Sequence, residues 1–421
     1  MSSAVTIAPV MTPGGVPEGA HARWIGCLDI DRVGEHDGRV TVTIAQPEGY
    51  RRARILLRDG SQPVDFVEAD IVGDAVTLDL PRPTRDPDVS TAAVLPPISV
   101  VLCTRERPED LAGALASLST LDYPDFEIIV VDNAPVTDAT ARVVAGAADA
   151  RIRRVLEPVA GLSNARNAGL RAARHDIVAF TDDDVVVDPY WLRGLAGGFE
   201  RSEEVACVCG MVPSGELRTA AQAYFDQRVS WAATLIPRSY SLAEPPPDLP
   251  LFPFQVGMYG TGANFAISRS AAAELGGFDE ALGAGTSTKG GEDIDMFFRL
   301  VAAGHTLVNE PAAIVWHRHR SDGAALLVQA RGYGLGLGAW LTKVFLDRVH
   351  RRLAFTVARR QFRSSVRAGA DYGAIMVAPD DLGDSIPSSV GRTEVLSVLG
   401  GPWALWRGRR QGRRPAPMRA G

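Results

Sequence analysis

The chain has 421 residues, of which 46% are hydrophobic and 22% are charged, a composition typical of a soluble globular protein. A single hydrophobic core usually stops growing at roughly 250 to 300 residues, so this length predicts two or three domains. No apolar run approaches the length of about 18 residues that a transmembrane helix needs, and the first 15 residues lack the pattern of a secretory signal. The four cysteines have the spacing of neither a disulfide framework nor a metal site, so we expect a reducing cytoplasm.

The net charge of −6 is unevenly distributed along the chain. Residues 341–421 contain 15 Lys and Arg against 6 Asp and Glu, a net charge of +9 that leaves −15 for residues 1–340. Apolar residues alternate with the cations at helical spacing, which favours amphipathic helices over a nucleic-acid-binding tail. Two interpretations remain: peripheral binding to the anionic inner face of the cell membrane, or helices that pack on the main domain or form a homodimer contact.

Composition divides the chain into five segments. Residues 1–21 are rich in Pro, Gly and Ala and are predicted to be disordered. Residues 22–80 contain short alternating runs separated by Gly and Asp, which indicate a small antiparallel β-rich accessory domain. Residues 81–97 contain five prolines and are expected to be a linker. Residues 98–320 are expected to form the main α/β domain, and residues 321–421 a helical basic extension.

The first half of the main domain repeats a strand, a loop and a helix. Strands are predicted at four apolar runs: Ile98–Cys103, Phe126–Val131, Ile152–Leu156 and Ile177–Phe180. This order predicts a mainly parallel sheet with crossover helices. Polar residues follow the strands or the loops after them, so one edge of the sheet is expected to collect Thr104, Asp132, Arg166 and residues Asp182 to Asp184.

Asp182, Asp183 and Asp184 form a run of three carboxylates directly after a predicted buried strand. Adjacent like charges repel, so the run is costly unless a positive group lies beside it. A hard divalent cation with oxygen ligands is the natural candidate. The alternative is a solvated acidic turn, because Asp is also a common turn residue.

Several sequence blocks in one order resemble glycosyltransferase family 2, in its bacterial form with an N-terminal β-rich extension. The blocks are ISVVLCTRERP, FEIIVVDN, GLSNARNAG, FTDDD, GTGANFAISR, GGEDIDMFFR and WHRH, which together span about residues 97 to 320. The resemblance implies a GT-A fold, a nucleotide-diphosphate sugar donor, a divalent cation (Mn²⁺ or Mg²⁺) and inversion at the anomeric carbon. No G-x-G-x-x-G follows the first strand, which argues against a dinucleotide site.

The resemblance also implies roles for the acidic residues and a histidine. Asp184 matches the family's metal ligand, and Asp182 or Asp183 would hold the ribose or share the metal. His317 would complete the metal site, with His319 as the alternative. Asp293 matches the family's catalytic base, which takes the proton of the acceptor hydroxyl, and its neighbour Glu292 is the second candidate. The competing interpretation is an N-cap for a helix over residues 294–303.

The nucleotide side is expected to use the loops after the first strands. Thr104, Glu106, Asp132, Asn133 and Arg166 are the candidates, because carboxylate and guanidinium groups bind ribose, base and pyrophosphate. The alternative interpretation is that Asp132 is a turn residue. The aromatic residues Tyr224, Trp231, Tyr240, Phe252 and Phe254 either line the acceptor side or belong to the core.

Two classes of function follow. The first is an inverting glycosyltransferase that acts on an envelope polysaccharide, a glycolipid or another lipid-linked glycan, or on a soluble small-molecule natural product. The second is a non-catalytic sugar-nucleotide-binding or scaffolding protein. The presence of Asp182, Asp184, Asp293 and His317 together favours the enzyme.

Overall fold

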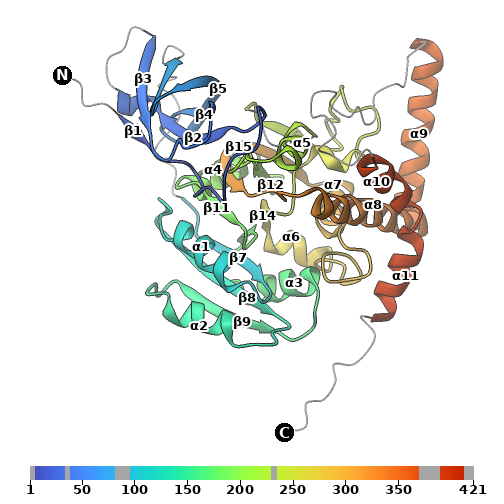
Figure 1. Cartoon of the computed structure of the whole chain (residues 1–421). Helices are drawn as coiled ribbons and strands as arrows, with labels where there is room; N and C mark the ends of the chain where they lie inside the picture. The colour runs from blue at the N-terminus through green and yellow to red at the C-terminus, as the bar shows by residue number, and fades with distance from the viewer. Residues whose placement is uncertain (1–4, 34–37, 81–94, 229–234, 369–388, 412–421) are drawn as a thin grey trace.

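A computed structural model describes residues 5–33, 38–80, 95–228, 235–368 and 389–411, without the side chains of 361–368 and 411. The chain forms a small N-terminal sheet, a large central sheet covered by helices, and a group of C-terminal helices along one side (Figure 1). Most of the expected linker, residues 81–94, lies outside the described residues. The division into domains at the predicted boundaries stays a prediction.

The N-terminal sheet has the strand order β1-β3-β6-β5-β4-β2. Its strands are β1 (Thr6–Ile7), β2 (Trp24–Asp29), β3 (Arg39–Ile44), β4 (Arg52–Asp59), β5 (Gln62–Val72) and β6 (Ala75–Asp79), and a 3-10 helix covers Ile30–Val33. The predicted antiparallel arrangement is wrong for two pairs, because β1 pairs with β3 and β2 with β4 in parallel. Each parallel pair is joined by a long connection, which parallel strands require.

The prediction of disorder for residues 1–21 is also wrong where the structure describes them, from residue 5 onward. Thr6 and Ile7 pair with Thr43 and Ile44 of β3. Later in this segment, Glu216 accepts a hydrogen bond from the Gly14 amide. The Pro- and Gly-rich composition therefore did not indicate this backbone pairing, because its partners are residues distant in the sequence.

The central sheet has the order β11-β15-β12-β14-β10-β7-β8-β9, with β13 paired to β15. Its strands are β7 (Ile98–Thr104), β8 (Phe126–Asn133), β9 (Ile152–Glu157), β10 (Ile177–Thr181), β11 (Val185–Val187), β12 (Val205–Met211), β13 (Arg238–Tyr240), β14 (Asn264–Ser268) and β15 (Thr306–His317). The four strands predicted from sequence pair in parallel, β9-β8-β7-β10. The sheet as a whole is mixed, because β14 runs antiparallel to both β10 and β12.

Helices cover both faces of this sheet (Figure 1). They are α1 (Pro108–Leu118), α2 (Ala139–Gly146), α3 (Leu162–Ala172), α4 (Trp191–Phe199), α5 (Ala220–Arg228), α6 (Arg269–Glu274) and α7 (Glu292–Ala302), with a 3-10 helix at Val256–Met258. Neighbouring strand residues belong to opposite cores: Val101 packs in the core with α3 and α7, and Val100 in the core with α1 and α4. Burial on both faces explains why these strands are continuously apolar.

The N-terminal sheet is fixed to the central sheet by a shared apolar cluster and by buried charges. Leu56 of β4 and Trp316 of β15 belong to one cluster, and each is at most 2% exposed. Two ion pairs of 2.7 Å cross the same boundary: Arg58 with Asp188, and Arg54 with Asp226.

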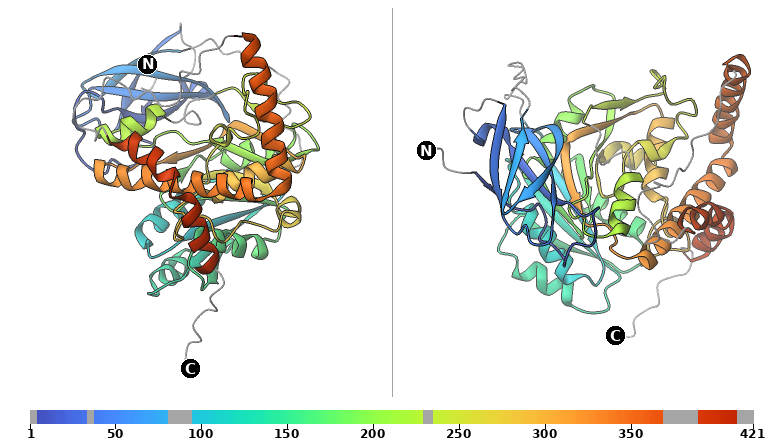
Figure 2. Two further views of the ribbon diagram at one scale, coloured as in Figure 1. Left: turned by 90° about the vertical axis from the view of Figure 1, so that its right-hand side faces the viewer. Right: turned by 45° about the horizontal axis from the view of Figure 1, so that its top comes forward.

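The C-terminal helices are α8 (Gly323–Leu346), α9 (Arg348–Ala368), α10 (Val390–Val398) and α11 (Gly401–Gln411). Trp340 of α8 is 1% exposed and its ring lies 5.4 Å from that of Phe298 in α7. Lys343 of α8 bonds Asp295 of α7 at 2.8 Å. The predicted packing of tail helices on the main domain is therefore correct for α8, while α9 projects from the body (Figures 1 and 2).

The glycine series of α8 lets other backbones approach the helix closely. A Cβ on Gly338 would lie 2.1 Å from the carbonyl oxygen of Val398 in α10, and one on Gly334 would lie 2.1 Å from that of Glu394. A Cβ on Gly336 would lie 2.7 Å from the carbonyl carbon of Gly290, just before α7. Close helix packing, rather than a dinucleotide loop, explains these glycines.

We expect Gly338→Ala to lower the free energy of unfolding by about 1 to 3 kcal/mol, because the new methyl group overlaps backbone atoms that cannot rotate away. Gly391→Ala in α10 is the matched control, since nothing lies within 4 Å of its added Cβ. That change should stabilise the helix by up to about 1 kcal/mol. Urea denaturation of both variants measures the difference, and equal stabilities would contradict the close approach of α8 and α10.

Candidate active site

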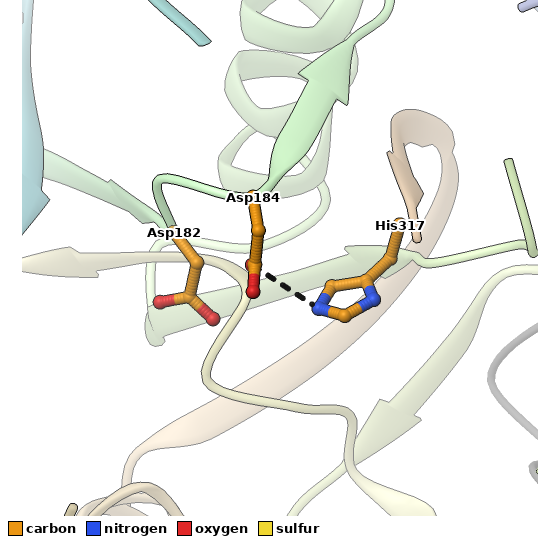
Figure 3. Close-up of side chains that lie close together, drawn as sticks. All are labelled: Asp182, Asp184 and His317. Atoms are coloured by element: carbon orange, nitrogen blue, oxygen red, sulfur yellow. Dashed lines mark ion pairs between the residues drawn. The ribbon is translucent and has the colours of Figure 1, made fainter. Parts of the chain in front are cut away.

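Asp182, Asp184 and His317 meet at one edge of the central sheet (Figure 3). The two aspartates lie between β10 and β11, and His317 is the last residue of β15. Antiparallel pairing of β11 with β15 sets Val185 opposite His317, which brings the histidine beside the acidic turn. One possible ligand atom from each of the three residues lies within 4.8 Å of the others, and Nε2 of His317 is 3.4 Å from Oδ1 of Asp184.

The charges of this cluster are strongly coupled. The pKa of Asp182 is raised to about 7. Burial is the largest cause, and the negative charges of Asp184 and Asp183 also raise it. Burial would also raise the pKa of Asp184, but the hydrogen bond and charge of His317, with Arg107, hold it below its usual range. For His317, burial lowers the pKa, while the bond to Asp184 outweighs burial and leaves it raised.

The cluster fits a divalent cation. Asp182 accepts no hydrogen bond from the described residues, and Nδ1 of His317 is buried without a partner. Burial is the largest cause of the raised pKa of Asp182, and a cation bound beside this carboxylate would favour its ionised form. Two carboxylate oxygens and one imidazole nitrogen form a donor set that suits Mn²⁺ and related ions.

Asp183 has different partners from its two neighbours. It is 5% exposed, and its Oδ2 accepts a 2.7 Å hydrogen bond from Thr104. Its Oδ1 accepts one of 2.6 Å from Arg107, which also reaches Asp184 at 3.1 Å. Thr104 and Asp183, both predicted to contact the nucleotide, are thus bonded to each other across the edge of the sheet.

Arg107 was missed by the sequence reasoning. It lies in the loop between β7 and α1, and the only signal for it is the block Arg-Glu-Arg-Pro after the first strand. Its guanidinium bridges two of the three clustered carboxylates, so it supplies part of the positive charge that the run of aspartates requires.

We expect Arg107→Met to lower the free energy of unfolding by about 1 to 2 kcal/mol in metal-free buffer, because Asp183 loses a charged hydrogen bond. Added Mn²⁺ should reduce the deficit, since it neutralises the same carboxylates. Thermal denaturation with EDTA and with Mn²⁺ measures this, with Arg105→Met at an exposed neighbouring position as the control. A deficit that Mn²⁺ leaves unchanged would contradict a shared counter-charge role.

Arg166 joins a second acidic group to the same edge. It is 2% exposed, and it donates to Glu292 at 2.9 Å and to the carbonyl of Gly262 at 3.0 Å. The charges of Glu292, Asp182 and Asp293 all raise its pKa against the effect of burial. Arg166 therefore binds the first turn of α7, and its charge also interacts with that of Asp182.

Asp293 and Glu292 occupy the first turn of α7, but neither is its N-cap. Gly291 holds that position with a φ of 94°, so the N-cap interpretation is wrong. Asp293 instead accepts hydrogen bonds of 2.8 Å from the amides of Gly262 and Ile294. Burial, with the charge of Asp293, raises the pKa of Glu292, and the buried Oε2 of Glu292 has no hydrogen-bond partner in the part of the chain that the structure describes.

The remaining candidates on the nucleotide side have distinct surroundings. Asp132 is fully buried and pairs with Arg154 at 2.8 Å, while its Oδ1 has no hydrogen-bond partner within the described ranges. Asn133 donates to the carbonyl of Val159 and accepts from the Gly161 amide. Both residues lie at the end of β8, so the turn interpretation of Asp132 is wrong.

Glu106 does not face the acidic cluster. Its carboxylate accepts from the amides of Val136 and Thr137 and from the Thr137 hydroxyl. These bonds, first among them the one from the Thr137 amide, lower the pKa of Glu106. Glu106 thus connects the loop after β7 to the loop after β8.

His319 lies beside His317 but outside the group of three. The two rings stack at 4.8 Å, and the His319 ring lies 4.3 Å from that of Phe225. Burial lowers the pKa of His319 well below its usual range, and neither ring nitrogen has a hydrogen-bond partner among the described residues. His319 therefore packs as a neutral aromatic group against the ring of His317.

Most of the aromatic residues whose role was open belong to the core. Tyr240, Phe252 and Phe254 pack in the main cluster, and Tyr224 packs with α8 and α10. Trp231 lies outside the described residues.

Comparisons with known proteins define the class. Residues 99–276 match the model for "Glycosyl transferase family 2". A pre-mycofactocin glycosyltransferase of Mycobacterium tuberculosis is 31% identical over 287 residues, which are 67% of this chain and 55% of that protein. The succinoglycan biosynthesis protein ExoM of Rhizobium meliloti is 31% identical over 224 residues, 52% of this chain and 65% of that protein. The chain thus spans about half to two thirds of the length of these relatives.

Among solved structures, the mannosyltransferase PcManGT of Pyrobaculum calidifontis, in complex with GDP-Man and Mn²⁺, aligns with a TM-score of 0.48 and 17% identity over 73% of this chain and 87% of that one. The family match and the mixed α/β sheet with its acidic edge define a glycosyltransferase domain. The chain belongs to glycosyltransferase family 2. The expected GT-A fold is thereby confirmed.

Proposed function

We propose that this protein transfers a sugar from a nucleotide-diphosphate donor to an acceptor hydroxyl, with inversion at the anomeric carbon and with Mn²⁺ or Mg²⁺ bound. The observation that supports the proposal most is that acidic groups of two elements act on the same buried arginine, Arg166. One is Asp182, which belongs to the cluster with Asp184 and His317, and the other is the start of α7 with Glu292 and Asp293. The reaction needs one acidic group to hold the cation that stabilises the leaving group, and another to remove the proton of the acceptor.

Departure of the nucleotide develops negative charge on its β-phosphate. A divalent cation held by Asp182, Asp184 and His317 would supply Lewis-acid stabilisation of that charge. Asp184 is kept ionised by His317 and Arg107, so it is ready to act as an oxygen ligand. Asp183, already bonded to Thr104 and Arg107, holds the loop in position.

Asp293 is assigned as the base. Its two oxygens accept from the amides of Gly262 and Ile294, which fix the orientation of the carboxylate. Each carboxylate oxygen keeps a second lone pair for an incoming proton. As the acceptor oxygen attacks the anomeric carbon from the face opposite the nucleotide, its proton passes to Asp293. Glu292 is held by Arg166, and we assign it a positioning role.

The acceptor is proposed to be an envelope or lipid-linked glycan, as the name of the Rhizobium relative suggests. The name of the mycobacterial relative points instead to a small soluble acceptor, which is the second candidate. Four free cysteines are compatible with reaction in the reducing cytoplasm.

A donor panel tests the proposal. We expect at least one nucleotide-diphosphate sugar to be hydrolysed slowly in the presence of Mn²⁺, with release of the nucleotide, and the rate to fall in excess EDTA. Glycan, lipid-linked and small acceptors added to that donor then identify the acceptor class. Tight donor binding without turnover of any donor would refute the enzyme and indicate a sugar-nucleotide-binding protein.

A further inference from the structure

Helices α10 and α11 share an exposed apolar surface, which we call the α10–α11 stripe. It consists of Val395, Leu396, Leu399, Trp403 and Trp406, which are 53%, 62%, 80%, 59% and 49% exposed. From Leu396 to Trp406 the spacing is three, four and three residues across the short connection between the helices, which is close to the period of one helical face, and Val395 adjoins Leu396. Five large apolar side chains in one run form a patch of the kind that marks an interaction site.

The two helices that carry the stripe have a net positive charge between positions 390 and 410. The guanidinium of Arg407 lies 4.5 Å from the Trp403 ring, and that of Arg410 lies 3.8 Å from the Trp406 ring. Arg392 is exposed on α10. Glu394 is the only acidic residue between positions 390 and 410, and it is paired with Arg228 of α5 at 2.9 Å.

The opposite side of these helices is anchored to the body. Ala404 and Leu405 are at most 2% exposed. A Cβ on Gly401 would lie 2.1 Å from the carbonyl carbon of Gly338 in α8, and one on Gly408 would lie 2.5 Å from the carbonyl oxygen of Ala281. The stripe is therefore held on a packed helix, and its outward side chains can be changed without removing this packing.

We infer that the α10–α11 stripe binds the surface of an anionic lipid bilayer. Indoles and arginine stems place apolar groups among acyl chains and keep their polar ends at the headgroups. Each cation near an anionic leaflet strengthens partitioning about fivefold. Within the described part of the chain no helix is long and apolar enough to cross a membrane.

Further exposed apolar residues lie where α8 meets α9. Phe345, Leu346 and Val349 are 53%, 60% and 72% exposed. All four C-terminal helices lie on the side of the molecule that faces the viewer in the left view of Figure 2. The inference goes beyond the proposed reaction and does not depend on it.

Vesicle co-sedimentation of the full chain tests the inference. We expect binding to vesicles of phosphatidylcholine and phosphatidylglycerol at about 2:1, and much weaker binding to pure phosphatidylcholine. Raising the salt from about 0.05 to 0.5 M should weaken the binding, because it shortens the Debye length. No binding to the anionic vesicles at low salt would overturn the inference.

Two double variants assign the binding to the stripe. Trp403→Ser with Trp406→Ser, and Arg407→Gln with Arg410→Gln, should each weaken binding at least tenfold. The matched controls are Val16→Ser with Val72→Ser, at positions 77% and 78% exposed, and Arg51→Gln with Arg269→Gln, also at exposed positions. Unchanged binding in both stripe variants would overturn the assignment. Sedimentation velocity provides a second test. A stable dimer that the tryptophan variant abolishes would also overturn the assignment, because a second copy of the chain would then cover the stripe.

Discussion

Asp184→Asn is expected to reduce turnover by about 10²- to 10³-fold, the scale of losing one electrostatic contributor to leaving-group departure. The amide keeps the shape of the side chain but removes the charge that would hold a cation between Asp184, Asp182 and His317. Steady-state kinetics with the donor identified by the panel, over a range of Mn²⁺ concentrations, measures the change.

Circular dichroism and thermal denaturation provide the control for Asp184→Asn. The side chain lies in a turn outside the main apolar clusters, so the fold should persist. A second control is Asp176→Asn, which changes an aspartate that serves only as an acceptor for Ser268 and Ser270 and the Ser270 amide. Wild-type activity in Asp184→Asn, or full activity of the unmodified protein in excess EDTA, would refute the metal assignment.

Asp293→Asn is expected to slow glycosyl transfer by about 10²- to 10⁴-fold, the contribution of a general base. An amide oxygen can still accept a hydrogen bond from the Gly262 amide, so the loop should stay in place. Asp293 is not part of the cluster of Asp182, Asp184 and His317, so metal-dependent donor binding should be retained. Calorimetric titration of donor with Mn²⁺, alongside transfer kinetics, separates the two effects.

Glu292→Gln is the comparison for the base assignment. It keeps a hydrogen-bond acceptor for Arg166 while removing the charge, and we expect a smaller loss of transfer than in Asp293→Asn. A larger loss in Glu292→Gln would transfer the role of base to Glu292. Joint loss of transfer and donor binding in Asp293→Asn would instead indicate that Asp293 only maintains the structure of the loop.

The sequence alone determined the parallel half of the main domain and the residues at its edge. Strand periodicity placed β7, β8, β9 and β10 nearly residue for residue, because continuous apolar runs are typical of strands buried on both faces. Parallel strands end at one edge, so the polar residues that follow them had to meet there. The approach of His317 to Asp182 and Asp184 agrees with the role that the family resemblance implied.

Only the tertiary structure decided how the three adjacent aspartates divide their contacts. Asp183 bonds Thr104 and Arg107, while Asp182 and Asp184 lie beside His317. This division depends on the turn between β10 and β11 and on a loop more than 70 residues away in the chain. The block Arg-Glu-Arg-Pro places Arg107 after the first strand, but it does not show which distant carboxylates the guanidinium contacts, which is why Arg107 was overlooked.

The antiparallel half of the sheet and the tail likewise required the folded molecule. The direction of β14 depends on its neighbours β10 and β12, not on its own apolar pattern. In the tail, the sequence shows that apolar and basic residues alternate. Which side of each helix is buried depends on which neighbouring helix its backbone approaches. Gly338 and Gly401 bring α8 and α11 together, and this contact leaves Trp403 and Trp406 exposed on the other side.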